Sequence, residues 1–250
     1  MAASLLFPAL VACNSADTPE APVDPKQALL ASTKEFGKGN FRFAMTDHEA
    51  TAEGVVDAGS RSAQMLMKLS DPDADMEMEI DFIVVDNDTW VKIDFGGALD
   101  GVPGMEALTS GKYLHLDPAK VKEIDDLSID FDKADPADVD LLLKAVTEVK
   151  EDAKGAYSGK IDLSKATKAN LIDEAILDEL GDEAKALAFT AKVDAQGRLT
   201  EFAVDVPAAG EVAAHQLKVA YSDYGSAPAP KKPADSEVAE APEEVYEMFS

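Results

Sequence analysis

The stretch Met76-Glu77-Met78-Glu79-Ile80-Asp81-Phe82 alternates apolar residues with carboxylates without interruption. Successive side chains of a β-strand point to opposite faces, so this pattern predicts a strand with one buried and one solvated face. Half-buried strands of this kind are typical of antiparallel sheets. Two upstream runs have the same period, namely Phe41, Phe43 and Met45, and then Met65, Met67 and Leu69. The sequence therefore predicts an antiparallel sheet with one apolar face.

Turn-forming residues divide the surrounding chain into further strands. Asp86-Asn87-Asp88 separates two apolar runs, residues 82–85 and 89–95, and predicts a tight hairpin. Other turns are predicted at Glu53-Gly54, Ala58-Gly59-Ser60 and Asp71-Pro72-Asp73. Strands are also expected at residues 113–116, 157–163, 188–193, 199–206 and 216–221. The chain is thus expected to be rich in short strands.

Three helices are predicted from apolar residues at helical spacing. The first covers residues 25–36, with Asp24 as its N-cap and Pro25 in its first turn. The second begins at Asp135-Pro136 and has its apolar face at Val139, Leu142, Leu143, Val146 and Val149; the third covers residues 170–180 and ends at Gly181. Together with the strands, they predict an α+β domain whose helices pack on one face of a curved antiparallel sheet.

The chain is strongly acidic. Its 49 acidic and 23 basic side chains give a formal net charge of -26 at pH 7. Phosphates repel a protein of this charge, which excludes nucleic acid as a partner. Hydrophobic residues make up 46% of the chain, enough for a sizeable core, and its single cysteine leaves no disulfide. Stability must therefore come from packing.

The N-terminus contains the pattern of a lipoprotein signal. Leu10-Val11-Ala12-Cys13 is a lipobox: a short apolar run leads through small or branched residues to the only cysteine. A diacylglyceryl group on Cys13 would supply the two chains that stable anchoring needs. Residues 1–12 contain no Lys or Arg, so the predicted signal peptide is truncated at its N-terminus. The alternative is a cytosolic protein with an apolar N-terminus and an incidental thiol.

These observations divide the chain into four parts. Residues 1–12 are the signal peptide, and residues 13–25 contain the lipidated Cys13 and a flexible, Pro- and acid-rich tether. Residues 26–225 form the folded domain. Residues 226–250 are an acidic Pro/Ala-rich tail, expected to be disordered or laid along the surface, with an apolar end at residues 245–249.

The chain resembles a known family of envelope proteins. The residues that carry the resemblance are the lipobox ending in Cys13, Asp88-Thr89-Trp90-Val91-Lys92, Tyr157-Ser158-Gly159-Lys160-Ile161-Asp162-Leu163, Val193-Asp194-Ala195-Gln196-Gly197-Arg198-Leu199 and Tyr221-Ser222-Asp223-Tyr224-Gly225. In pattern and order, over residues 26–225, they are similar to the LppX/LprG-type lipoproteins of actinobacteria, which belong to the LolA/LolB-like lipoprotein-carrier superfamily. The resemblance implies a curved antiparallel half-barrel sheet wrapped around helices, with an apolar cavity that takes lipid tails.

The resemblance and the methionine content together predict a binding function. Methionine is flexible and polarizable and suits promiscuous apolar binding. The candidate cavity lining is Phe41, Phe43, Met45, Met65, Met67, Met76, Met78, Ile80 and Phe82. We expect a monomeric, lipid-anchored protein of the cell envelope, outside the cytoplasm, that binds or transports a lipid or lipidated glycolipid. The alternative is a tethered interaction or sensor-accessory protein of the same fold, with a filled core and no ligand.

The sequence contains no pattern of a catalytic or metal site. Its three histidines, His48, His115 and His215, have no ligand spacing and are interpreted as ordinary strand or surface residues. Residues 71–75 resemble the start of a calcium loop but lack its glycine and its bidentate glutamate. A phosphate-binding loop and a nucleophile elbow are also absent from the sequence. We therefore expect no enzyme activity, no cofactor and no metal.

Overall fold

The computed structural model of the chain describes residues 24–71, 76–99, 101–103, 105–122, 124, 131–132, 135–167, 169 and 174–248. The first six strands are β1 (Asn40–Thr46), β2 (Ala50–Asp57), β3 (Ser62–Asp71), β4 (Met76–Val85), β5 (Asp88–Asp94) and β6 (Tyr113–Leu116). Each of them pairs antiparallel with the next, so they form one meander. The predicted hairpin between β4 and β5 and the strand at residues 113–116 are confirmed.

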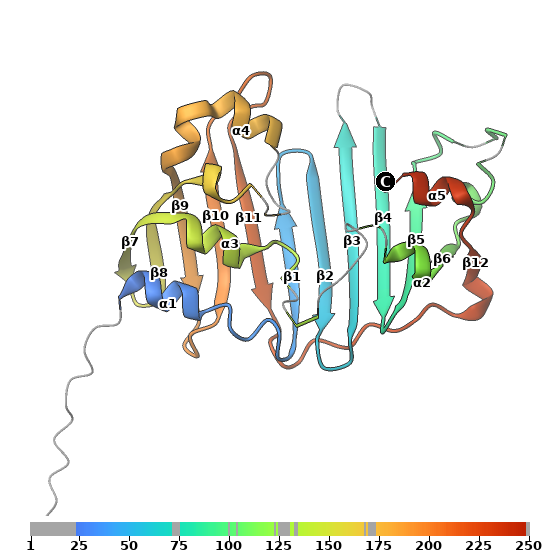
Figure 1. The fold of residues 1–250 in the computed structure, drawn as a ribbon, viewed down its shortest axis with the longest axis horizontal. Helices are drawn as coiled ribbons and strands as arrows, with labels where there is room; N and C mark the ends of the chain where they lie inside the picture. The colour runs from blue at the N-terminus through green and yellow to red at the C-terminus, as the bar shows by residue number, and fades with distance from the viewer. Residues whose placement is uncertain are drawn as a thin grey trace, which may run out of the picture.

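A second meander completes most of the sheet. It consists of β7 (Val146–Ala153), β8 (Ala156–Ile161), β9 (Leu187–Val193), β10 (Leu199–Val206) and β11 (His215–Ser222). These strands also pair antiparallel in sequence order, and β11 pairs antiparallel with β1. The two meanders are therefore joined through the first strand of one and the last strand of the other (Figure 1).

The last strand comes from the C-terminal segment. Strand β12 (Val238–Glu240) pairs in parallel with β6. The described strands form one open 12-stranded sheet in the order β12-β6-β5-β4-β3-β2-β1-β11-β10-β9-β8-β7. The predicted α+β class and the antiparallel character of the sheet are confirmed, and the sheet is open between β12 and β7.

Among the described residues, five short helices accompany the sheet. They are α1 (Pro25–Ala31), α2 (Pro118–Val121), α3 (Val139–Ala145), α4 (Glu174–Leu180) and α5 (Glu243–Glu247), with 3-10 turns η1 (Leu108–Ser110), η3 (Leu163–Lys165), η4 (Gly181–Ala186) and η5 (Asp235–Glu237). In Figure 1 the helices lie in two groups in front of the sheet, α1, α3 and α4 toward the second meander and α2 and α5 toward β5 and β6. No helix among the described residues combines the length and apolar character needed to cross a membrane.

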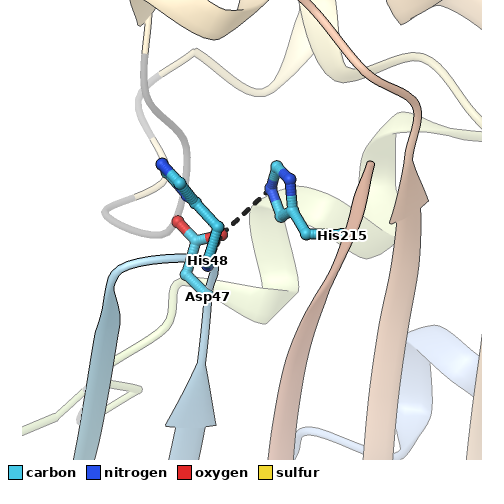
Figure 2. Close-up of side chains that lie close together, drawn as sticks. All are labelled: Asp47, His48 and His215. Atoms are coloured by element: carbon cyan, nitrogen blue, oxygen red, sulfur yellow. Dashed lines mark hydrogen bonds and ion pairs between the residues drawn. The ribbon is translucent and has the colours of Figure 1, made fainter. Parts of the chain in front are cut away.

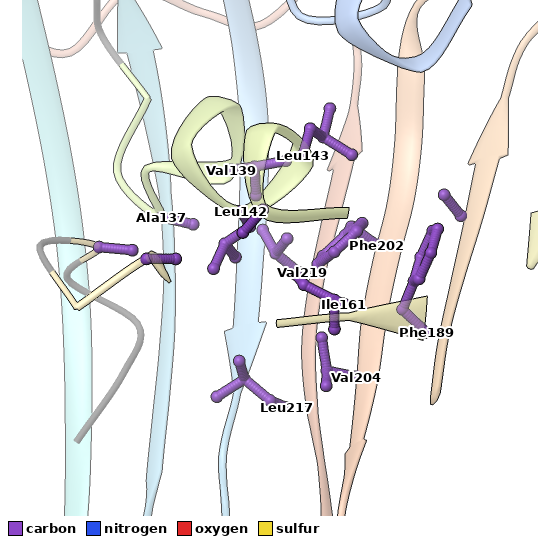
Figure 3. Close-up of a cluster of buried hydrophobic side chains, with 14 of the residues drawn as sticks. Ala137, Val139, Leu142, Leu143, Ile161, Phe189, Phe202, Val204, Leu217 and Val219 are labelled. Carbon is purple, nitrogen blue, oxygen red and sulfur yellow. The ribbon is translucent and has the colours of Figure 1, made fainter. Parts of the chain in front are cut away.

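The two helix groups correspond to two hydrophobic clusters. The larger cluster joins α1, α3 and α4 to the second meander and to β1 and β2. Figure 3 shows part of it, with Val139 and Leu142 of α3 near Phe202 of β10 and Val219 of β11. The smaller cluster joins α2, α5 and η1 to β4, β5 and β6. Each helix group thus covers its own end of the same sheet.

The first predicted helix begins as expected but is shorter. The Asp24 carboxylate accepts a hydrogen bond from the Gln27 amide at 3.1 Å, and Pro25 stands in the first turn, so the predicted cap is confirmed. The helix ends at Ala31, and the chain continues in turns to Lys38. Phe36 is still buried, because these turns carry its ring into the larger cluster.

The second predicted helix is correct only in its first half. Helix α3 ends at Ala145, and Val146 and Val149 belong to strand β7. The pairing of β7 with β8 is irregular between Val146 and Glu148, as in a β-bulge. Val146 lies opposite Ile161 and Val149 opposite Gly159, so both valines face the core although they are three residues apart. The bulge therefore produces in a strand the spacing that predicted a helix.

Three smaller predictions have mixed outcomes. The strand predicted over residues 157–163 ends at Ile161, and Leu163 begins a 3-10 turn. The third helix is confirmed over Glu174–Leu180; residues 170–173 lie outside the described residues. The predicted end is also confirmed, because α4 ends at Leu180 and Gly181 follows it with a φ of 52°; the separate 3-10 turn η4 begins at Gly181. The turn at residues 58–60 is confirmed, and that at residues 71–73 lies largely outside the described residues.

The turn predicted at Glu53-Gly54 is wrong. Gly54 lies inside β2, directly between Phe43 of β1 and Met65 of β3. A Cβ atom on Gly54 would lie 2.7 Å from the Phe43 ring and 2.1 Å from the Gln64 carbonyl oxygen. Glycine is therefore needed here for close packing across the strands rather than for a change of chain direction.

The C-terminal segment is built into the fold. Of the two expected arrangements, the described residues of the tail show the chain laid along the domain, where it adds β12 and α5. Val245 is fully buried in the smaller cluster. The Tyr246 hydroxyl accepts a hydrogen bond from the Asp117 amide at 2.8 Å. The tail therefore closes one end of the sheet, as its apolar residues 245 and 246 suggested.

Candidate functional site

The nine candidate residues lie at positions on one face of the sheet. Across the strands, Met45 is level with Met67 and Ile80, and Phe43 is level with Met65 and Phe82. Phe41 lies two residues from Phe43 on β1, and Met76 and Met78 continue the same alternation on β4. This is the face that carries both hydrophobic clusters, so the predicted common face is confirmed.

Burial divides these nine residues into two groups. Phe41 and Phe43 are closed within the larger cluster, and Ile80 within the smaller one. Five others are only partly buried: Met45 and Met65 pack against the larger cluster, and Met67, Met78 and Phe82 against the smaller one. The side chain of Met76 lies outside the described residues. The five partly buried residues, which we call the apolar strip, are the part of the predicted lining that retains exposure to solvent.

The apolar strip occupies the middle of the sheet. It crosses β1, β3 and β4, between the two groups of helices (Figure 1). Because β2 lies between β1 and β3, the strip extends over four strands, which at the usual spacing of about 4.8 Å gives it a width of about 14 Å. Leu69, opposite Met78, and Phe95, which follows β5, are partly buried beside it. The strip therefore connects the two clusters with flexible apolar side chains that neither cluster fully covers.

The opposite face of β3 and β4 is mainly polar, although Leu66 and the buried Ile83 also lie on it. Lys68 of β3 forms an ion pair with Glu79 of β4 at 2.6 Å. The Asp81 carboxylate accepts a hydrogen bond from the Tyr113 hydroxyl at 2.5 Å. Burial, together with this bond and the negative charge of Asp81, raises the pKa of Tyr113 well above its ordinary value. Lys68, Glu79 and Asp81 thus lie opposite the apolar strip.

Three surface hollows lined by described residues lie elsewhere. One of about 310 Å³ borders Phe36 and Asp135. Another of about 160 Å³ borders Phe95 and Leu108, and a third of about 480 Å³ borders Trp90. None of these three is lined by a residue of the apolar strip.

The structure brings together two histidines that are far apart in the sequence. His48 lies in the turn between β1 and β2, and His215 is the first residue of β11. Their ring centroids are 4.8 Å apart, and Asp47 lies within ionic distance of both (Figure 2). Their spacing of 167 residues gave no sign of this, and only the pairing of β1 with β11 reveals it. His115, the third histidine, lies on β6 near Asp88 and Glu240.

The predicted lipid attachment at Cys13 and the tether up to residue 23 lie outside the described residues. A comparison of the chain with models of known protein families finds no match, and a comparison with curated proteins finds none either.

Proposed function

We propose that the protein is a lipid-anchored envelope protein outside the cytoplasm, and that it binds an acyl chain non-covalently on the apolar strip. The ligand class is a lipid or lipidated glycolipid, and the function is binding or transport rather than catalysis. The fold we propose within the α+β class is that of the LppX/LprG-type and LolA-like carriers. The observation that supports this proposal is the strip itself: five methionine and phenylalanine side chains left partly exposed between two closed clusters.

The side chains of the apolar strip suit an acyl chain. Exposed apolar patches of soluble proteins commonly mark binding sites. Methionine adapts its shape to an apolar partner, and each buried methylene of an acyl chain contributes about 0.8 kcal/mol. A lipid tail laid between the helix groups would thus cover the strip without a need for polar contacts. A nucleic acid is excluded by the net charge of -26.

A charge within the apolar strip should prevent this binding. We expect Met67→Lys to weaken binding of a fluorescent C16 fatty acid at least about tenfold, since burial of an ammonium group beside the acyl chain costs free energy. The control is Leu66→Lys, which introduces the same charge one residue earlier and on the opposite face of β3, level with Glu53 and Asp81. Fluorescence titration of the chain from residue 14 onward measures the fatty-acid affinity of both variants. Equal loss in the two variants would reject the strip as the binding surface.

The anchor is tested separately through Cys13. Cells that express the full chain should incorporate radioactive palmitate into it, and the protein should appear in the membrane fraction. We expect Cys13→Ala to lose the label and to move to the soluble fraction, because the substitution removes the only thiol of the chain. Unchanged label and unchanged membrane association in the variant would overturn the lipid anchor and leave acyl-chain binding to be judged on the titration.

The second candidate is a tethered interaction protein of the same fold with a filled core. The burial of Phe41, Phe43 and Ile80 favours it, because these three predicted lining residues are already packed against protein. Native mass spectrometry of the chain from residue 14 onward, purified without detergent from an envelope-bearing host, distinguishes the lipid carrier from the interaction protein. A discrete added mass that dissociates as lipid supports the carrier. A chain that stays free of ligand after incubation with envelope lipids supports the interaction protein.

A further inference from the structure

Three side chains with metal-binding atoms meet at one end of β1 and β11. The Asp47 carboxylate lies 3.0 Å from Nε2 of His215 and 3.3 Å from Nδ1 of His48, all measured to Oδ1. One ligand atom from each of the three residues can be chosen so that all lie within 4.8 Å of one another. Figure 2 shows the two turn residues on one side and His215 facing Asp47 from β11. Two imidazoles and a carboxylate thus lie close together.

The hydrogen bond on the far side of His215 fixes which nitrogen faces Asp47. Its Nδ1 lies 3.0 Å from the carbonyl oxygen of Ala213. A carbonyl oxygen only accepts, so Nδ1 carries a hydrogen and donates it, and Nε2 is directed at Asp47. In a neutral ring the lone pair of Nε2 would then face a carboxylate oxygen at 3.0 Å, which is repulsive. A cation bound by both atoms removes this repulsion.

The surroundings favour the metal cation. Histidines that bind metals usually donate their second ring N–H to a backbone carbonyl or carboxylate, as His215 does to Ala213. On His48, Nδ1 faces Asp47 and Nε2 lies 3.7 Å from the Glu49 carboxylate, which is beyond hydrogen-bond distance. Oδ1 of Asp47 accepts a hydrogen bond from the His48 amide at 2.7 Å, and because each carboxylate oxygen has two lone pairs, Oδ1 can keep that bond and also bind a cation.

We propose that Asp47, His48 and His215 form a binding site for a divalent transition metal of the Zn²⁺ type. Two imidazole nitrogens with one carboxylate are typical ligands of Zn²⁺, whereas Mg²⁺ and Ca²⁺ prefer oxygen alone. Three protein ligands leave a coordination position for water or another molecule. The side chains of Asp47 and His48 are 24% and 23% exposed, so an ion reaches the site from solvent. This site replaces the expectation that the chain binds no metal.

The test is a calorimetric titration of Zn²⁺ into the metal-stripped full chain. Excess Mg²⁺ is present throughout, because the chain has 49 acidic side chains that bind cations weakly. We expect one Zn²⁺ ion to bind tightly per chain. The affinity for Zn²⁺ should be at least about 100-fold lower in His215→Ala and at least about tenfold lower in His48→Ala. The matched control is His115→Ala, which removes a histidine that lies near two carboxylates but is not part of the cluster. It should change the affinity by less than about twofold.

A measurement on the unaltered chain keeps the proposal independent of how the variants fold. Long-range ¹H–¹⁵N spectra report the state of each imidazole nitrogen, and Zn²⁺ should shift Nε2 of His215 and Nδ1 of His48 while His115 stays unchanged. The proposal would be overturned if no Zn²⁺ bound tightly in the presence of Mg²⁺, or if His115→Ala and His215→Ala lowered the Zn²⁺ affinity equally. In either case a protonated Nε2 of His215 in the spectra would assign the 3.0 Å contact to an imidazolium–carboxylate pair.

Discussion

Val245→Asp is expected to detach the C-terminal segment from the sheet and to destabilise the domain by about 4 kcal/mol, because it buries an unpaired carboxylate. Val245 is fully buried against β5, β6 and α2 in the smaller cluster. The hydroxyl of its neighbour Tyr246 accepts a hydrogen bond from the Asp117 amide. The Lys120 ammonium group lies 4.3 Å from the centroid of the Tyr246 ring. Lys120 also pairs with Glu243, so displacement of α5 breaks these contacts with α2 and its N-cap Asp117.

Two measurements detect this effect. The midpoint of thermal unfolding should fall by about 10 °C, since 1 kcal/mol shifts it by roughly 2–4 °C in a domain of this size. Hydrogen exchange should accelerate at β6, which loses its parallel neighbour β12. The control is Met248→Asp in the turn after α5, where the residue is 43% exposed and little change is expected. An unchanged midpoint together with unchanged exchange at β6 in Val245→Asp would contradict the docked tail.

Strands β1 and β4 could be predicted from the sequence because apolar and polar residues alternate along them; β5, where Thr89, Trp90 and Val91 are all buried, does not have one solvated face. In β4 this gives the strict alternation from Met78 to Phe82, and the pairing of β3 with β4 keeps the same register throughout. The prediction failed where packing replaced alternation. Gly54 resembles a turn residue but accommodates the ring of Phe43, and the bulge at Val146 gives a strand the apolar spacing of a helix. Both depend on a neighbouring strand that the local sequence does not reveal.

The candidate site could likewise be predicted in part. The alternation of apolar and polar residues was sufficient to place the methionines and phenylalanines on one face, because a strand has only two faces. It could not show that Phe43 is closed while Met65, on the same row, is partly exposed, since this depends on which helix covers each strand. The Asp47, His48 and His215 cluster depends on the pairing of the first strand with the eleventh. No periodicity within either segment contains that information.

Asp135 should make the stability of the domain depend on pH between about 4 and 6. Burial raises the pKa of its carboxyl group from 3.8 to about 6, with a smaller contribution from the charge of Asp138. Hydrogen bonds from the Tyr221 hydroxyl at 2.8 Å and from the Ala137 and Asp140 amides oppose the shift. The carboxyl group stands before α3 and is joined to β11 through Tyr221, so its protonation acts on the centre of the larger cluster.

The sign follows from the raised pKa. Below about pH 4 the group is protonated in both the folded and the unfolded chain and has no effect on stability. Between about pH 4 and 6 the unfolded chain releases the proton first, so the free energy of unfolding falls as pH rises, and above about pH 6 the loss is complete. At about 1.4 kcal/mol for each pKa unit, the difference between 3.8 and about 6 corresponds to about 3 kcal/mol.

Asp135→Asn should remove most of this dependence. Asparagine keeps one oxygen to accept the hydrogen bond from Tyr221, but it presents an amide group where the second oxygen faced the Asp140 amide. We therefore expect a net stabilisation of about 1–2 kcal/mol at pH 8 and little or none at pH 4, measured by urea unfolding across this range. Asp178→Asn removes one exposed carboxylate from α4 and corrects for the general relief of negative charge. If both variants changed stability equally at every pH, the ionisation of Asp135 would not be the cause, and the acidic surface as a whole would be.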